Sequence, residues 1–342
     1  MDAYRGRKAL VTGGLGFVGS NLAIRLVELG ADVTVLDVLW PDHGGNLFNI
    51  YPVRHNLKLN ICDIRDKRAL DILVKDADFV FHLAGQCSHV LGQIDPYPDI
   101  DINIHGTAVL MESVKASAPD AVTVFTSTRG VYGTVVQLPA AEDAATNPKG
   151  LYELSNLAAE KLINFYHDVH GLRTVNLRLS NIYGERSQML HSKFGVVNWF
   201  VRLAMEGKTI QVFGGGGILR DFLYVDDCVE AILRTAASEG VFGETFNVGS
   251  DRRCTILDLV KTIVGVAGSG GWESAPFTAE RAAQEPGDFY PDITKIKEAS
   301  GWAPATGLQE GLKRTLDYYR AHRDMYWQRE PDRKNLIMAG GR

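Results

Sequence analysis

Three glycines near the N-terminus have the spacing of a phosphate-binding loop. Gly13, Gly16 and Gly19 follow an apolar run at Lys8–Thr12 and open an amphipathic segment at Phe17–Leu29. Glycines in such a loop let the backbone turn tightly and approach a pyrophosphate, which then lies at the N-terminus of the helix. A tight turn alone would explain the glycines equally well, so the interpretation depends on the flanking strand and helix. Together they predict a dinucleotide-binding site.

A carboxylate after the second apolar run bears on the choice of dinucleotide. Asp37 directly follows Asp32–Leu36, where an acidic side chain accepts hydrogen bonds from the adenosine ribose. It would repel a 2′-phosphate, and Val38-Leu39-Trp40 offers no cation to bind one. NAD is therefore predicted over NADP, and a strand-end turn residue is the alternative for Asp37. Asp63, followed by Ile64, either meets the adenine amino group or caps the next helix.

Short β-branched runs alternate with helical patterns over the first two-thirds of the chain. Nearly continuous apolar strands separated by helices are typical of a parallel sheet covered on both faces. The expected strands are Lys8–Thr12, Asp32–Leu36, Leu57–Ile61, Phe79–Leu83, Val122–Thr126 and Thr174–Leu179, and the expected helices include Phe17–Leu29 and Ile102–Ser117. The sequence thus predicts an α/β protein with a doubly wound parallel sheet, the Rossmann fold.

After about residue 180 glycines cluster and loops lengthen, which indicates a second, smaller unit. We expect an NAD-binding Rossmann domain over residues 1–180, with later segments at about 209–250 partly interleaved. A smaller C-terminal lobe at 181–330 would mainly bind substrate, and residues 331–342 would form a tail.

Composition and charge exclude several classes of function. The formal net charge is −5 without a basic run, so no nucleic-acid partner is expected. No segment approaches the ~20 apolar residues of a membrane span, and no signal peptide is expected before the first strand. The spacing of Cys62, Cys87, Cys228 and Cys254 predicts reduced thiols in a cytoplasmic protein. The nine histidines form no metal-binding pair, so we predict no metal.

Seven short motifs occur in the order found in one known family. They are Thr12–Gly19, His82–Gln86, Asn103–Thr107, Thr126–Gly133, Asn181–Gly184, Arg220–Asp227 and Phe246–Gly249. Through them the chain resembles, from residue 8 to about 320, the extended short-chain dehydrogenase/reductases, and within these the NAD-dependent sugar-nucleotide epimerases and dehydratases. The resemblance implies bound NAD and a nucleotide-sugar substrate. The residues assigned to the cofactor are Gly13, Gly16, Phe17, Val18, Gly19, Asp37, Asp63, Ile64, Leu83, Ala84, Gly85, Asn103, Thr126, Tyr152 and Asn156.

The resemblance also assigns the catalytic residues. Tyr152 falls at the position of the tyrosine that takes the proton of a sugar hydroxyl, and Thr128 at the position of the hydroxyl that orients it. A phenolate can accept that proton while hydride passes from the carbon to the nicotinamide. Without the motifs on both sides, Tyr152 would be a helix-start aromatic residue and Thr128 a strand-end hydroxyl.

One departure from the family pattern lies at the catalytic helix. Asn156, one turn after Tyr152, stands where the family has a lysine that holds the nicotinamide ribose and lowers the tyrosine pKa. A unit charge ~6 Å away at an effective dielectric of ~20 contributes roughly 3 kcal/mol, about two pK units. Lys149 is a candidate replacement from the preceding loop, whereas Lys161 is too far along the helix. With Asn156 in place of the lysine, three outcomes are open. The protein is a slow enzyme, an enzyme that uses another base, or a binding protein without turnover.

A second departure concerns the substrate diphosphate. Glu285 stands where the family has an arginine that contacts the diphosphate, while Arg220 occupies the other diphosphate position. Arg281 is a candidate substitute for the missing arginine. The alternative for Arg220 is a surface salt bridge with Asp221 or Asp226.

Further substrate contacts are predicted from strand ends and family register. Gln86 and Ser88 follow the fourth strand and Asn181 the sixth, with loop hydrogen bonds as the alternative. Val212, together with Phe213, would flank the nucleotide base unless it packs in a core. The predicted substrate residues are Gln86, Ser88, Thr128, Arg129, Asn181, Val212, Arg220 and Arg281. Core or strand-end roles, not catalysis, are expected of His82, His89 and His105.

The two residues that follow Thr128 help to distinguish the possible reactions. Dehydratases of the family resemble one another in an Asp-Glu pair there, and decarboxylases carry a Glu at the second position, whereas this chain has Arg129-Gly130. Epimerisation needs no acid–base pair beyond the tyrosine, so it is the leading hypothesis. The alternatives are a dehydratase, decarboxylase or reductase with unusual residues. Arg129 would bind a substrate carboxylate or phosphate, or be a solvent-facing loop residue.

The helix expected at 151–166 has two apolar stripes, which indicates burial on two sides. At 100° per residue they are Leu154, Leu157, Ala158, Leu162 and Phe165 on one side, and Tyr152, Ala159, Ile163 and Tyr166 on the other. One stripe can pack on the sheet. Relatives pair this helix and the one near Ile102–Ser117 across a two-fold axis, so we predict a homodimer. The alternative is a monomer in which the C-terminal lobe or tail covers the stripe.

Overall fold

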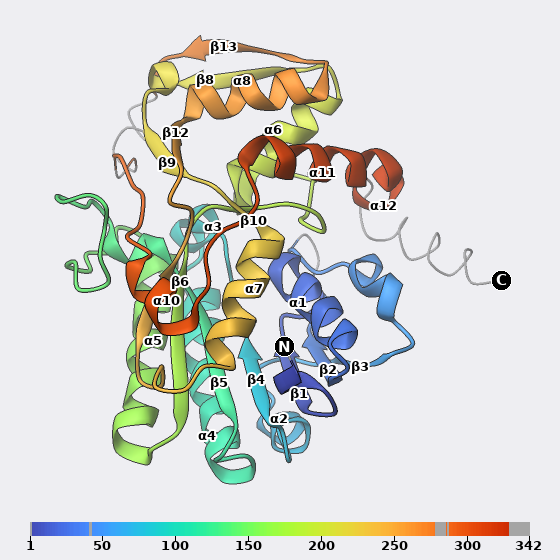
Figure 1. Cartoon of the computed structure of the whole chain (residues 1–342), viewed down its shortest axis with the longest axis vertical. Coiled ribbons are helices and arrows are strands. Elements are labelled where there is room, and N and C mark those ends of the chain that lie inside the picture. The colour runs from blue at the N-terminus through green and yellow to red at the C-terminus, as the bar shows by residue number, and fades with distance from the viewer. Residues whose placement is uncertain (1, 41–42, 278–284, 286, 328–342) are drawn as a thin grey trace.

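The computed structural model describes residues 2–40, 43–277, 285 and 287–327 (Figure 1). Its centre is a seven-stranded sheet in the order β11-β6-β5-β4-β1-β2-β3, in which every neighbouring pair is parallel. The strands are β1 (Lys8–Thr12), β2 (Asp32–Asp37), β3 (Leu57–Ile61), β4 (Phe79–His82), β5 (Val122–Thr128), β6 (Arg173–Leu179) and β11 (Thr245–Val248). The predicted doubly wound parallel sheet is confirmed, and the six predicted strands are all present with ends shifted by at most two residues.

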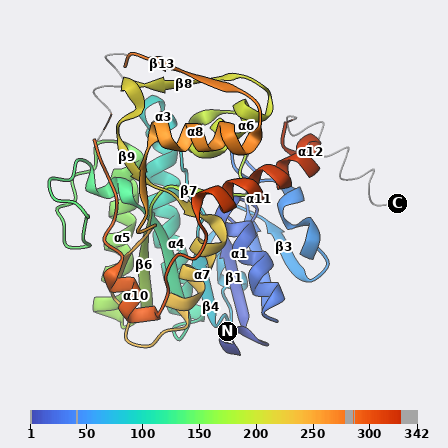
Figure 2. The ribbon, with the colours of Figure 1, turned by 45° about the horizontal axis from the view of Figure 1, so that its top comes forward.

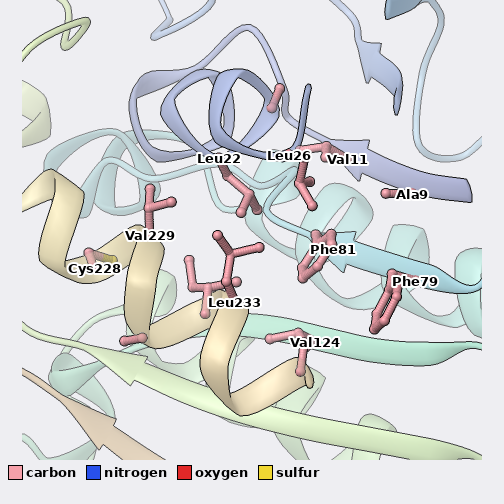
Figure 3. Packing of buried hydrophobic residues seen from close by; sticks show 14 of the residues in the cluster. Ala9, Val11, Leu22, Leu26, Phe79, Phe81, Val124, Cys228, Val229 and Leu233 are labelled. Atoms are coloured by element: carbon pink, nitrogen blue, oxygen red, sulfur yellow. The ribbon is translucent and has the colours of Figure 1, made fainter. Parts of the chain in front are cut away.

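Helices cover both faces of this sheet. On one face α1 (Phe17–Glu28) and α7 (Val225–Ala236) pack side by side over β1, β4 and β5, where Leu22, Leu26 and Leu233 meet Phe81 and Val124 (Figure 3). The other face is covered by α2 (Lys67–Leu73), α4 (Thr107–Ser117) and α5 (Leu151–His170). Because helices cover both faces, the central strands are buried over most of their length.

The helix predicted at Ile102–Ser117 begins earlier and in a different geometry. Residues Asp99–Gly106 form a π-helical segment, and α4 continues from Thr107. Such wide turns occur often at functional sites. Here the segment carries Asn103 to the carboxyl ends of the strands.

A smaller lobe stands beyond the end of the sheet, at the top of Figure 1. Its strands form three short pairs: β8 (Thr209–Phe213) with β13 (Gly271–Ala275), β9 (Leu219–Asp221) with β12 (Arg253–Thr255), and β7 (Ile182–Tyr183) with β10 (Leu223–Tyr224). Its helices are α6 (Val196–Met205), α8 (Ile256–Ala267), α11 (Leu308–Ala321) and α12 (Arg323–Trp327). Figure 2 shows α8 and α11 lying side by side over this lobe.

The chain crosses between the two parts more than once. After β9 and β10 it returns to the large sheet as α7 and β11, and α10 (Thr294–Ser300) packs against both of these elements. The shorter elements are α3 (His89–Ile94) and the 3-10 turns Asp2–Tyr4, Leu47–Val53, Arg129–Tyr132, Ser192–Phe194 and Gly214–Gly216. Within the described residues, no helix has the length and apolar character needed to cross a bilayer.

Candidate active site

A cavity of about 350 Å³ runs along the carboxyl ends of the large sheet. It lies where the strand order reverses between β1 and β4, which is the place where open α/β sheets bind their ligands. All of the residues that the sequence assigned to the cofactor line it, from the glycine loop to Tyr152 and Asn156 on α5.

The glycine loop has the geometry that its spacing predicts. Gly13 has a φ of +69°, a conformation that side chains rarely adopt, and it packs against the backbone of Leu83 and Ala84. A Cβ on Gly19 would lie 2.2 Å from the carbonyl oxygen of Gly13. These positions therefore admit only glycine, and they leave the N-terminus of α1 open to a phosphate.

Asp37 joins the end of β2 to this loop. One carboxylate oxygen accepts a hydrogen bond from the Leu15 amide at 3.0 Å, and the other accepts one from the Leu39 amide at 2.9 Å. Burial raises the pKa of Asp37, and these backbone donors oppose the rise. The lining residues contain no lysine or arginine among those described, so nothing there would bind a 2′-phosphate. The part of the cavity formed by the glycine loop and Asp37 therefore fits NAD.

Asp63 lines the cavity, but it does not cap the following helix. Its carboxylate pairs with Arg65, with oxygen–nitrogen distances of 2.9 and 2.7 Å, and this pairing lowers the pKa of Asp63. The cap of α2 is Asp66, which accepts a hydrogen bond from the Ala69 amide. The capping alternative for Asp63 is therefore wrong.

A buried polar network supports the floor of the cavity. His82 bridges the hydroxyls of Thr12 and Thr107 at 3.0 and 2.9 Å, and burial lowers its pKa to about 4. Asn103 accepts from the Gln86 amide at 2.8 Å and donates to the Ser155 hydroxyl at 2.9 Å. His82 thus has a core role, His89 instead pairs with Glu153 on α5, and His105 is exposed.

Tyr152 and Thr128 meet at one end of the cavity, from the start of α5 and the end of β5. Burial raises the pKa of Tyr152 far above its ordinary value, and nearby Cys87 adds to the rise. A hydrogen bond with the Thr128 hydroxyl opposes it. The tyrosine is therefore held as a neutral phenol that needs help to give up its proton.

Asn156 does not supply that help. Its side-chain amide donates to the backbone carbonyl of Tyr152 at 2.8 Å, within the same helix. Lys149 and Lys161 are both exposed, and neither lines the cavity. The hypothesis that Lys149 replaces the family lysine is therefore wrong.

A buried ion pair behind the catalytic residues was not predicted. Glu160 on α5 binds Arg178 of β6 at 2.8 Å and accepts a hydrogen bond from Ser127, next to Thr128. Both charged side chains are almost fully buried. The pair fixes α5 against the ends of β5 and β6, and so positions Tyr152 relative to Thr128.

Arg220 is buried and pairs with Glu285 at 2.5 Å, and it also donates to the Gly287 carbonyl. The alternative salt bridge with Asp221 or Asp226 is not formed. Glu285, the departure from the family pattern, thus neutralises the arginine predicted to bind the diphosphate. Arg281 lies outside the described residues.

Three predicted substrate residues need correction. Ser88 is fully buried and caps α3 by accepting from the Leu91 amide, so its hydroxyl is already used. Val212 is 1% exposed and belongs to the core of the small lobe. Asn181 donates to the Asp221 carbonyl at 3.0 Å and does not line the cavity. Gln86 lines the cavity, but its amide nitrogen is bonded to Ser88 and Asp99.

The sequence interpretation missed the side chains that close the cavity. They are Trp40, His43, Gly44, Gly45, Cys87, Ser180, Ser187, Gln188 and Phe194, together with neighbouring strand-end residues. Trp40 stacks on His43 with ring centroids 4.9 Å apart, and His43 contacts Phe194 from the small lobe. An aromatic residue just after Asp37 was a local signal, but the approach of Phe194 depends on tertiary structure.

The chain is similar to known proteins over most of its length. The profile of the NAD dependent epimerase/dehydratase family matches residues 9–249. A UDP-glucose 4-epimerase of Mycolicibacterium smegmatis is 32% identical over 92% of this chain and 98% of its own. A dTDP-glucose 4,6-dehydratase of Streptomyces griseus is 31% identical, with 93% and 95% covered. The structure of an epimerase from Methanothermobacter thermautotrophicus superposes with a TM-score of 0.88 at 27% identity, covering 95% of each chain.

The chain belongs to the NAD dependent epimerase/dehydratase family. It is an NAD-dependent sugar-nucleotide epimerase or a related dehydratase, and the predicted resemblance and cofactor are confirmed. Among the residues that the structure describes, no three His, Cys, Asp or Glu side chains gather in a way that would hold a metal ion.

Proposed function

We propose that the protein epimerises a nucleotide-activated sugar by transient oxidation of a ring hydroxyl. The observation that carries the proposal is the meeting of Tyr152 and Thr128 at the end of a cavity lined by the whole predicted cofactor set. Bound NAD supplies the hydride acceptor and later the donor. Tyr152 takes and returns the hydroxyl proton, and Thr128 orients that hydroxyl through its own hydrogen bond.

Epimerisation is favoured over water loss by the residues after Thr128. Arg129 and Gly130 carry no carboxylate, and a Cβ on Gly130 would lie 2.5 Å from the Cγ of Glu153. No larger side chain fits at position 130 unless Glu153 moves. The turn after β5 therefore carries no acid–base pair for eliminating water.

The close approach of Glu153 to Gly130 supports a second candidate function, that of a sugar-nucleotide dehydratase. Glu153 places its carboxylate beside Gly130, and one of its oxygens lies 2.6 Å from Nδ1 of His89. Hydrogen bonding to Glu153 raises the pKa of His89. This carboxylate–imidazole pair would provide an acid and a base from α5 and α3 in place of the residues missing from the turn after β5.

The substrate class rests on the relatives, whose names specify UDP-glucose and dTDP-glucose. A test incubates the NAD-loaded protein with UDP-, CDP-, GDP- and dTDP-sugars and follows the products by mass and chromatography. Epimerisation gives an isomer of unchanged mass. Loss of water would replace this proposal with the dehydratase, loss of carbon dioxide would indicate a decarboxylase, and binding without any product would reject turnover altogether.

We also propose that the protein is a homodimer. Ala159, Ile163 and Tyr166 pack inward from α5, whereas Leu154 and Phe165 on the opposite stripe are 49% and 47% exposed. An apolar stripe on a long helix favours an isologous contact with a second copy of α5. A cytoplasmic location is proposed because the four cysteines are unpaired.

A further inference from the structure

Arg129 is a partly buried cation beside Thr128, and no described residue pairs with it. It is the first residue of the 3-10 turn that follows Thr128, and it lies next to the lining of the cavity without being part of it. Its guanidinium lies over the ring of Phe289 at 5.0 Å. A guanidinium has five N–H donors, yet among the described residues none of these donors has a hydrogen-bond acceptor or a salt-bridge partner.

The charged groups that face Arg129 are Arg220, Asp221, Glu285 and Glu153. Asp221 and Glu285 are engaged elsewhere, and Glu153 is engaged through only one of its two oxygens. Asp221 accepts from the Ser180 hydroxyl and the Ser250 amide, and Glu285 binds Arg220. Glu153 bonds to His89 through one oxygen, and its other oxygen is buried against Gly150. Burial, followed by the charge of Arg220, lowers the pKa of Arg129 to about 10.

The part of the Arg129 guanidinium that is withdrawn from water is stabilised when an anion accepts its hydrogen bonds. Removing a cation from water without a hydrogen-bonded anion is strongly unfavourable. Planar guanidinium donors match the paired oxygens of a carboxylate or a phosphate. Glu285 already pairs with Arg220. Of these two neighbouring arginines, Arg129 is therefore the one that remains available to an incoming anion.

We propose that Arg129 binds an anionic group of the substrate, and so serves as the anion-recognition residue of this site. The inference rests on the proposed function for the identity of the substrate as a sugar nucleotide. Two sources share the required chemistry: the diphosphate, and a carboxylate on the sugar ring. The first makes Arg129 the counterpart of the arginine lost at position 285, and the second makes the enzyme selective for acidic sugars.

The test compares wild type, Arg129→Gln and Arg129→Lys as NAD-loaded full-length proteins. Calorimetric titrations use UDP, UDP-glucose and UDP-glucuronate, repeated with dTDP and dTDP-glucose. Loss of a charge-assisted hydrogen bond weakens binding by about 10- to 100-fold. If Arg129→Gln weakens every probe, the diphosphate is the partner. If it weakens UDP-glucuronate alone, the partner is the sugar carboxylate. Arg129→Lys keeps the positive charge and should therefore lose less affinity than Arg129→Gln.

Arg68→Gln, an exposed arginine on α2, is the matched control and should bind like wild type. Thermal unfolding provides a second measurement, because removal of an unpaired, partly buried cation should leave the melting temperature unchanged or raise it. Unchanged Kd values in Arg129→Gln, a failure of that variant to fold, or a wild type that binds none of the probes would overturn the proposal. Changed Kd values without any turnover would instead reject the epimerase and leave this inference standing.

Discussion

Asn156 donates its side-chain amide to the backbone carbonyl of Tyr152 at 2.8 Å, one helical turn earlier. An amide in this position stabilises the start of α5 but brings no charge to the phenol. Burial raises the pKa of Tyr152, so in the proposed mechanism the positive nicotinamide of NAD⁺ would be the group that favours the phenolate. The chemistry of this enzyme thus depends on its cofactor more than the family pattern implies.

Replacing Tyr152 by phenylalanine should abolish turnover while NAD binding is retained. The change removes the proton acceptor and leaves the ring in place, so kcat should fall by about 10²- to 10⁴-fold. Stopped assays on the productive sugar nucleotide and NAD titration measure the two properties. Tyr166→Phe on the same helix is the control, because its hydroxyl bonds Glu112 away from the cavity. Full activity in Tyr152→Phe would remove the tyrosine from the mechanism.

Asn156→Lys should raise activity at neutral pH. In the proposed mechanism Tyr152 acts as the phenolate, so the rate should rise with pH toward the elevated pKa of Tyr152. An ammonium one turn away lowers that pKa, and the rising limb of the pH–rate profile should move to lower pH by about two units. Asn156→Gln lengthens the side chain without adding charge and should leave the profile in place. A profile that is the same in all three proteins would show that another group limits the rate.

Asp37 should determine the preference for NAD over NADP. Wild type should bind NAD far more tightly, because the carboxylate accepts from the ribose and repels a 2′-phosphate. Asp37→Asn should weaken NAD binding by about 10- to 100-fold and reduce the ratio of NAD affinity to NADP affinity. Asp32→Asn, an exposed site at the other end of β2, should change neither affinity. Calorimetry measures the affinity of each protein for both dinucleotides. Equal or tighter NADP binding by wild type would contradict the prediction.

Breaking the Glu160–Arg178 pair should destabilise the fold strongly. Glu160→Gln leaves a buried guanidinium without its counterion, at a cost of about 3–5 kcal/mol in the free energy of unfolding. Asp317→Asn in the exposed pair with Arg320 should cost at most about 1 kcal/mol. Urea unfolding of both variants gives the comparison. Similar losses in the two would mean that the buried pair contributes no more than a surface one.

Light scattering at micromolar concentration should give about twice the chain mass of 37.6 kDa. Introducing charge on the exposed stripe of α5 with Leu154→Glu and Phe165→Glu should yield monomers, since an apolar interface does not tolerate unpaired carboxylates. Ile72→Glu, at a more exposed apolar site on α2, should remain dimeric. A wild-type mass near that of one chain rejects the dimer.

Much of this protein could be predicted from local pattern. Strand positions, the glycine loop and Asp37 follow from period, backbone freedom and strand ends, which are properties of neighbouring residues. The order of motifs placed Thr128 and Tyr152 in the same site, and the structure brings them together at the cavity. Parallel strands bring their carboxyl ends to one edge of the sheet, so residues far apart in the chain converge without any further information.

Only the tertiary structure decided which of these side chains are free to act. Ser88 and Gln86 are used by a helix cap and a buried network, and Val212 lies inside the small lobe. Arg220 is paired with Glu285, whereas Arg129 next to Thr128 has no such partner among the described residues. Residue type and spacing state what a side chain is able to bind. Its actual partners depend on contacts across the two parts of the fold, because each hydrogen-bonding group is satisfied by whatever the folded chain places beside it.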